Sequence, residues 1–185
     1  MNNTKSIYYP PGGILMWIII YLELITFGMA LVALAFSAKD DLQLFHESSL
    51  HLNKTFGTIN TIFLLASGYF VAMAVQNFKE KNFKSASYQF KIAMLGGLFF
   101  IILKSVEYYI KLESGFVLDT NTFFTFYWLL TGFHLIHVLV GLVILFLLTR
   151  NLKTKVIEDV EASATFWHMC DLIWLLLFPV LYLIF

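Results

Sequence analysis

The chain has 185 residues, of which 59% are hydrophobic and 13% are charged, whereas soluble domains have about 45–50% apolar and about 25% charged residues. Twelve Lys and Arg residues balance twelve Asp and Glu residues, so the formal net charge is zero. This composition excludes an ordinary soluble globule, and the neutral charge excludes a nucleic-acid surface. We expect the partners of the chain to be lipids and other apolar helices.

Five apolar stretches are long enough to cross a bilayer, which takes about 20 residues of helix. In chain order, the predicted helices cover about residues 14–37, 55–77, 92–111, 122–149 and 162–185. The first carries Glu23, but thirteen Leu, Ile, Val or Phe residues between Ile14 and Phe36 offset the cost of inserting one carboxyl group. The sequence therefore predicts an all-α membrane bundle of five transmembrane helices, forming one domain over residues 1–185.

The residues outside these helices predict the orientation. Pro10, Pro11, Gly12 and Gly13 are helix breakers directly before the first helix. The N-terminus lacks a basic segment ahead of a short apolar core, and the apolar run after Gly13 is too long for a signal peptide, so the first helix is expected to be retained. Eight Lys and Arg residues fall on the side of the N-terminus and three on the other side. Because positive loops remain in the cytoplasm, we expect a cytoplasmic N-terminus and an external C-terminus.

Ionisable residues inside these spans are functional hypotheses, because they are costly in lipid. Glu23 lies near the predicted midplane, where it is either a proton-exchanging or headgroup-sensing carboxyl or a neutral interhelical hydrogen-bonding group. Lys104 and Glu107 are three residues apart on one helix, which predicts an ion pair.

The histidines offer too few ligands for a redox metal. His134 and His137 share one helix face, and His168 is the remaining histidine inside a predicted span, so a diheme or di-iron site would lack ligands. Interhelical hydrogen bonding is the favoured interpretation for the first two. The lone Cys170 excludes an intrachain disulfide and a Cys-based zinc site, and is interpreted as a small core residue.

The last helix carries a second polar pair. His168 and Asp171 are three residues apart between Trp167 and Trp174, so the carboxylate could fix the imidazole tautomer, form a charged pair or act only as scaffold. Trp167, near the predicted helix start, is expected to anchor at headgroup level. The glycines inside the spans predict close helix approach; they are Gly28, Gly68, Gly96, Gly97, Gly132 and Gly141.

Several motifs together resemble subunit III of the haem-copper oxidases, the cytochrome c oxidase subunit 3 family. Residues 131–141, TGFHLIHVLVG, are similar to the family's TGxHxxHVxxG stretch. Residues 166–174, FWHMCDLIW, resemble its (Y/F)WHFVDxVW stretch and depart from it at Met169 and Cys170. Matches in the same order complete the resemblance, which spans about residues 12–182: Met16-Trp17 with Glu23, Leu65 to Gly68, and Glu107-Tyr108.

The resemblance implies a non-redox accessory subunit of a respiratory complex in aerobic electron transport, in the bacterial inner membrane. Haem and copper would belong to a catalytic subunit I-like partner and other oxidase subunits, and this subunit would support sustained turnover and proton uptake. Glu23 occupies the position of a carbodiimide-reactive membrane carboxyl in several members. The expected interior polar framework comprises Lys104, Glu107, His134, His137, Trp167, His168, Asp171 and Trp174.

Phospholipid is a further ligand that the resemblance implies. The seven-helix form of the family has two additional helices that enclose a phospholipid-binding cleft. This sequence matches the last five helices, as do shorter bacterial members.

Three alternatives remain open. Residues 104–108, 120–124, 166–169 and 178–182 look most like the accessory member associated with bacterial nitric oxide reductase. A small proton or solute transporter built around Glu23 and Glu107 is disfavoured, because no inverted repeat and no pair of broken helices is visible. A haem-binding electron carrier would be excluded by a colourless purified protein.

Overall fold

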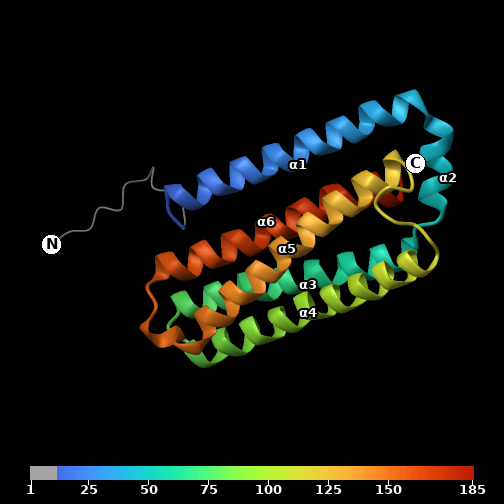
Figure 1. The fold of residues 1–185 in the computed structure, drawn as a ribbon. Coiled ribbons are helices and arrows are strands. Elements are labelled where there is room, and N and C mark those ends of the chain that lie inside the picture. The colour runs from blue at the N-terminus through green and yellow to red at the C-terminus, as the bar shows by residue number, and fades with distance from the viewer. Residues whose placement is uncertain (1–11) are drawn as a thin grey trace.

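The computed structural model describes residues 12–185, and within this range every regular element is a helix (Figure 1). The elements are α1 (Ile14–Asp40), α2 (Leu42–Leu50), α3 (Lys54–Lys79), α4 (Phe83–Glu113), α5 (Thr122–Arg150), the 3₁₀ turn η1 (Leu152–Thr154) and α6 (Ile157–Tyr182). Five of these helices are long and apolar enough to cross a membrane. The predicted all-α bundle of five transmembrane helices is confirmed.

Several helices extend beyond their predicted apolar cores. Helix α4 begins at Phe83 instead of residue 92, because the Asn82 side chain accepts a hydrogen bond from the Ser85 amide and caps the helix. The predicted polar connection after α1 contains α2, which Asp41 caps in the same way. Helix α6 begins at Ile157 instead of residue 162. The predicted bounds followed hydropathy, whereas polar turns, capped by a side chain in α2 and α4 but not in α6, continue these helices beyond the hydrocarbon.

Helix α6 is the central element of the bundle. It packs against α1, α3 and α5, and α3 and α4 pair closely as an antiparallel hairpin. Figure 1 shows α1 along the outside of the bundle and α2 across one end, here termed the α2 end. The most apolar 18-residue stretch of α6 is 56% buried, against 17% for α1. Helix α1 therefore presents most of its surface to lipid or to a partner.

Trp167 on α6 packs where α4, α5 and α6 meet. Its ring is fully buried, so the predicted headgroup anchor is wrong; the earlier start of α6 moves Trp167 well into the helix. A Cβ atom on Gly97 would lie 2.5 Å from Trp167 Cη2, and one on Gly141 would lie 2.8 Å from Cε3. The indole thus lies in a slot that glycines on two helices keep open.

The remaining glycines do not all serve close packing. Gly68 and Gly96 face side-chain or backbone atoms of neighbouring helices at short distance. A Cβ atom on Gly28 or Gly132 would meet nothing within 4 Å. The predicted packing role is therefore wrong for these two positions. The N-terminal predictions that involve Lys5, Pro10 and Pro11 lie outside the described residues.

Candidate functional site

The predicted polar residues form three separate groups instead of one framework. The first is the tyrosine–ion-pair cluster of Lys104, Glu107, Tyr127 and Tyr182 at the α2 end. The second is the Glu23–His137 pair between α1 and α5, and the third is the His168–Asp171 pair on α6.

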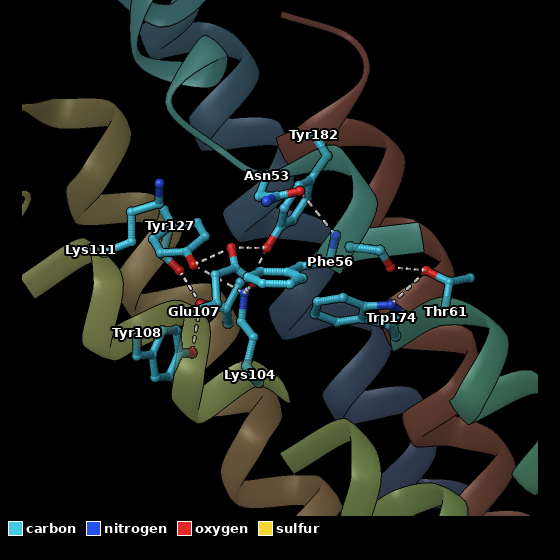
Figure 2. Close-up of polar contacts among 12 residues, drawn as sticks. Asn53, Phe56, Thr61, Lys104, Glu107, Tyr108, Lys111, Tyr127, Trp174 and Tyr182 are labelled. Atoms are coloured by element: carbon cyan, nitrogen blue, oxygen red, sulfur yellow. Dashed lines mark hydrogen bonds and ion pairs between the residues drawn. The ribbon is translucent and has the colours of Figure 1, made fainter. Parts of the chain in front are cut away.

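The ion pair predicted for Lys104 and Glu107 is present at the centre of the first cluster (Figure 2). Lys104 Nζ donates hydrogen bonds to Glu107 Oε2 at 3.1 Å, to the Tyr127 hydroxyl at 3.1 Å and to the Tyr182 hydroxyl at 2.7 Å. Both tyrosine hydroxyls donate in turn to Glu107 Oε1, at 2.8 and 2.7 Å. All three ammonium donors and both carboxylate oxygens are therefore satisfied.

This cluster joins α4, α5 and α6 in the buried interior of the bundle. Each of its four residues is at most 1% exposed. A buried ion pair is tolerated only when further hydrogen bonds compensate for the lost water, and the two tyrosines provide them. We interpret the cluster as a structural connection between three helices. Sequence reasoning missed Tyr127 and Tyr182. The only available signal was that α5 carries a tyrosine near its start and α6 carries one at its end, both close to the C-terminal end of α4.

Glu23 has a partner that the sequence did not indicate. Its Oε2 lies 3.3 Å from His137 Nε2, at ion-pair distance but without hydrogen-bond geometry. His137 Nδ1 lies 2.8 Å from the Phe133 carbonyl oxygen. A carbonyl oxygen can only accept, so Nδ1 must carry a hydrogen.

That hydrogen bond limits which protonation states of Glu23 and His137 make a favourable contact. With Nδ1 protonated, a favourable contact requires either a carboxylic acid facing a neutral imidazole or a carboxylate facing an imidazolium. In both arrangements Glu23 and His137 share one proton beyond the Nδ1 hydrogen. The pair is thus chemically able to hold and exchange a proton at the junction of α1 and α5.

The third pair faces outward. His168 Nδ1 lies 3.5 Å from Asp171 Oδ2, and the His168 side chain is 45% exposed while that of Asp171 is 9% exposed. The expected interior position of His168 is therefore wrong in the isolated chain. Gly68 on α3 lies directly against the Asp171 carboxylate, where any Cβ atom would collide with Oδ2. The glycine lets α3 approach the pair closely.

His134 does not form the expected interhelical hydrogen bond. Its ring is fully buried, stacks on Trp174 with centroids 5.3 Å apart, and meets Phe100 edge-on at 5.7 Å. Neither ring nitrogen has a hydrogen-bond partner among the described residues. Trp174 itself donates to Thr61 Oγ1 at 2.9 Å, which connects α6 to α3. His134 therefore serves as an aromatic packing residue in this chain.

The geometry does not bring the histidines together. His134 lies in the aromatic core, His137 faces Glu23, and His168 lies on the outer surface. Within residues 12–185, no three His, Cys, Asp or Glu side chains are grouped so that they could hold a metal ion.

Comparisons with known proteins agree with the motifs. A family model described as cytochrome c oxidase subunit III matches residues 49–184. Cytochrome c oxidase subunit 3 of Petromyzon marinus is 35% identical over 129 residues, which cover 67% of this chain and 48% of the relative. The corresponding proteins of Drosophila yakuba and Rattus norvegicus are 33% and 34% identical over the same length, with the same coverage.

The matched region extends from the end of α2 to α6 and includes the tyrosine–ion-pair cluster and the His168–Asp171 pair. The chain spans about half the length of the curated relatives it matches. The matches give no support to the nitric-oxide-reductase branch or to a transporter. The chain belongs to the cytochrome c oxidase subunit III family and is a multi-pass membrane protein.

Proposed function

We propose that this chain is a non-redox accessory subunit of a haem-copper oxidase and binds its catalytic subunit through the α3–α6 face. Haem and copper would be held by the partner subunits. We further propose the bacterial plasma membrane as its location, with a cytoplasmic N-terminus and an external C-terminus. Family membership supports the accessory role, and the excess of Lys and Arg on one side supports the orientation.

The exposed His168, paired with the buried Asp171, is the observation that carries this proposal. His168 lies six residues beyond Ala162, where the charge-free part of α6 begins, which is roughly 9 Å along the helix axis and therefore inside the membrane. Ionisable groups at that depth are expensive in lipid and normally face protein or a water-filled cavity. A half-exposed imidazole there indicates a surface that another protein covers.

The surroundings of the pair suit a helix–helix interface. Leu172 and Leu175 follow His168 on the same face of α6 and are 45% and 39% exposed. Leu65 and Tyr69 are exposed on α3, which packs beside α6. A polar pair surrounded by apolar side chains can supply a directed hydrogen bond within an otherwise apolar membrane contact.

Replacing His168 with Leu should weaken assembly without unfolding the subunit. The imidazole is half exposed, so its loss removes a group that faces the partner and leaves the core packing unchanged. Co-purification of the catalytic subunit from mild detergent should fall roughly 3- to 20-fold, as expected for the loss of an intramembrane hydrogen bond worth about 0.6–1.7 kcal/mol. The helicity and thermal unfolding of the chain should not change.

Thr26→Leu on the exposed surface of α1 is the matched control for this test, because it also replaces a polar side chain with leucine. It should leave the yield of the complex unchanged. An intact complex at normal yield with His168→Leu would contradict the proposed face. Loss of the complex with Thr26→Leu alone would place the contact on α1 instead.

Glu23→Gln should shorten the working life of the complex more than it slows electron transfer. A glutamine amide cannot share a proton with His137, so the α1–α5 proton site is lost while the fold is kept. We expect an unchanged initial rate of oxygen reduction and fewer turnovers before inactivation, measured by following oxygen consumption to completion. Glu113→Gln, on an exposed carboxyl at the end of α4, serves as the control. A reduced initial rate with an unchanged inactivation time would contradict this role.

A further inference from the structure

A basic pocket lies at the end of the bundle opposite α2. It has a volume of about 590 Å³ and is formed by the first turns of α4, the end of α5 and η1. Four of the residues that line it are cations: Lys84, Lys91, Arg150 and Lys153. No Asp or Glu lines the pocket, and none of the four cations forms an ion pair with any residue from 12 to 185. The pocket thus concentrates positive charge that nothing in the described chain neutralises.

The pocket lies at the level of the lipid headgroups. Lys84, Tyr88, Lys91, Leu95 and Leu98 follow one another at helical spacing on one face of α4. Along this face the side chains change from basic and aromatic to purely aliphatic between Lys91 and Leu95. Residues 92–103 contain no charged side chain, so the hydrocarbon region begins there. The 67% exposed Tyr88 is typical of an aromatic residue at the membrane interface.

An exposed apolar surface continues from the pocket into the membrane. Leu95 and Leu98 are 54% and 47% exposed on α4. On α5, the Arg150 guanidinium lies 5.9 Å from the centre of the Phe146 ring, one turn deeper in the membrane, and Phe146 is 54% exposed. A molecule in the pocket would therefore meet cations at one end and aliphatic or aromatic side chains at the other.

We propose that this pocket binds the phosphate headgroup of an anionic phospholipid, with the acyl chains lying along the exposed side chains of α4 and α5. Arginine recognises phosphate oxygens in a bidentate manner, and lysines add point charge. Ser87 and Asn151 also line the pocket and supply neutral hydrogen-bonding groups for a headgroup. The apolar continuation favours a lipid over a water-soluble phosphate, which would leave those side chains uncovered. The site is independent of the proposed oxidase role and of the cleft formed by the two additional helices of the longer family members.

Native mass spectrometry of the full chain in detergent, titrated with phosphatidylglycerol or phosphatidylcholine, tests the proposal. Phosphatidylglycerol should bind more tightly. The double variant Lys91→Gln/Arg150→Gln removes one cation from each helix and should weaken phosphatidylglycerol binding roughly 30-fold, since a cation near an anionic lipid surface contributes about 1 kcal/mol. Phosphatidylcholine binding should change little.

Two control double variants distinguish the loss of positive charge in the pocket from the loss of positive charge elsewhere and from a change of side chain. Lys39→Gln/Lys54→Gln removes two cations at the α2 end and should leave phosphatidylglycerol binding unchanged. Lys91→Arg/Arg150→Lys keeps both charges in the pocket and should bind phosphatidylglycerol within roughly threefold of the original chain. If the glutamine variant does not fold, the proposal is still tested by the charge-retaining double variant and by the comparison of the two lipids on the unaltered chain.

Three results would overturn the proposal. Equal binding of the two lipids would exclude recognition of an anionic headgroup. Unchanged phosphatidylglycerol binding by a folded Lys91→Gln/Arg150→Gln chain would place the lipid elsewhere. Displacement of phosphatidylglycerol by millimolar inorganic phosphate would show that the pocket binds a small water-soluble anion instead of a lipid.

Discussion

Glu107→Leu is expected to lower the free energy of unfolding by about 3–5 kcal/mol, the cost of removing one member of a buried ion pair. The substitution leaves the Lys104 ammonium fully buried without a counter-ion. It also removes the acceptor that the Tyr127 and Tyr182 hydroxyls share. Unfolding of the purified chain by detergent titration, followed by circular dichroism, measures the loss.

Two further variants distinguish this explanation from a general effect of leucine on α4. Glu113→Leu replaces an exposed carboxyl on the same helix and should change stability by less than about 1 kcal/mol. The double variant Lys104→Met/Glu107→Leu removes both charges, so it should be more stable than Glu107→Leu alone. A double variant that is less stable than the single one would refute the argument from an unpaired charge.

Gly141→Ala is expected to destabilise the bundle by about 1–3 kcal/mol through overpacking. The new methyl group would approach Trp167 Cε3 and Cζ3 at 2.8 and 3.0 Å, and Gly97 faces the neighbouring ring atoms Cη2 and Cζ2. Adding Gly97→Ala should cost at least as much again, because its methyl group would lie only 2.5 Å from Cη2 of the same ring. The same detergent titration measures both steps.

Gly132→Ala is the matched control, since it lies on the same helix and its Cβ atom would meet nothing within 4 Å. There the usual advantage of alanine over glycine in a helix, up to about 1 kcal/mol, should appear as a small gain in stability. Equal effects of Gly132→Ala and Gly141→Ala would mean that the Trp167 slot does not constrain the bundle.

Hydropathy predicted the five spans because each span needs about 20 apolar residues, and such a stretch can be recognised in the sequence without any knowledge of tertiary contacts. The true helix ends depended on Asn82 and Asp41, whose capping hydrogen bonds form in polar segments that a hydropathy criterion assigns to connections. Helix α2 was missed for the same reason.

Contacts within one helix were predictable, whereas contacts between helices were not. Lys104 and Glu107 are neighbours on one helix at a fixed spacing. The pairing of Glu23 with His137 depends on how α1 and α5 are rotated and shifted against each other, which no local pattern specifies. The same holds for the outward orientation of His168, because the polarity of a residue does not indicate whether the chain itself or a partner covers it.

A single proton between Glu23 and His137, as the favourable arrangements of this pair require, would determine how the pair responds to a membrane voltage. Transfer of that proton between the two side chains moves charge by only a few ångströms and leaves the net charge unchanged, so the electric field has little effect on it. Gain of a second proton, or loss of the first, changes the net charge by one deep within the bilayer. Carrying one charge across the whole bilayer corresponds to about 2.3 kcal/mol per 100 mV, so a charge placed at mid-depth feels about half that energy. A net charge at this pair would therefore interact with the membrane voltage, whereas a neutral pair would not.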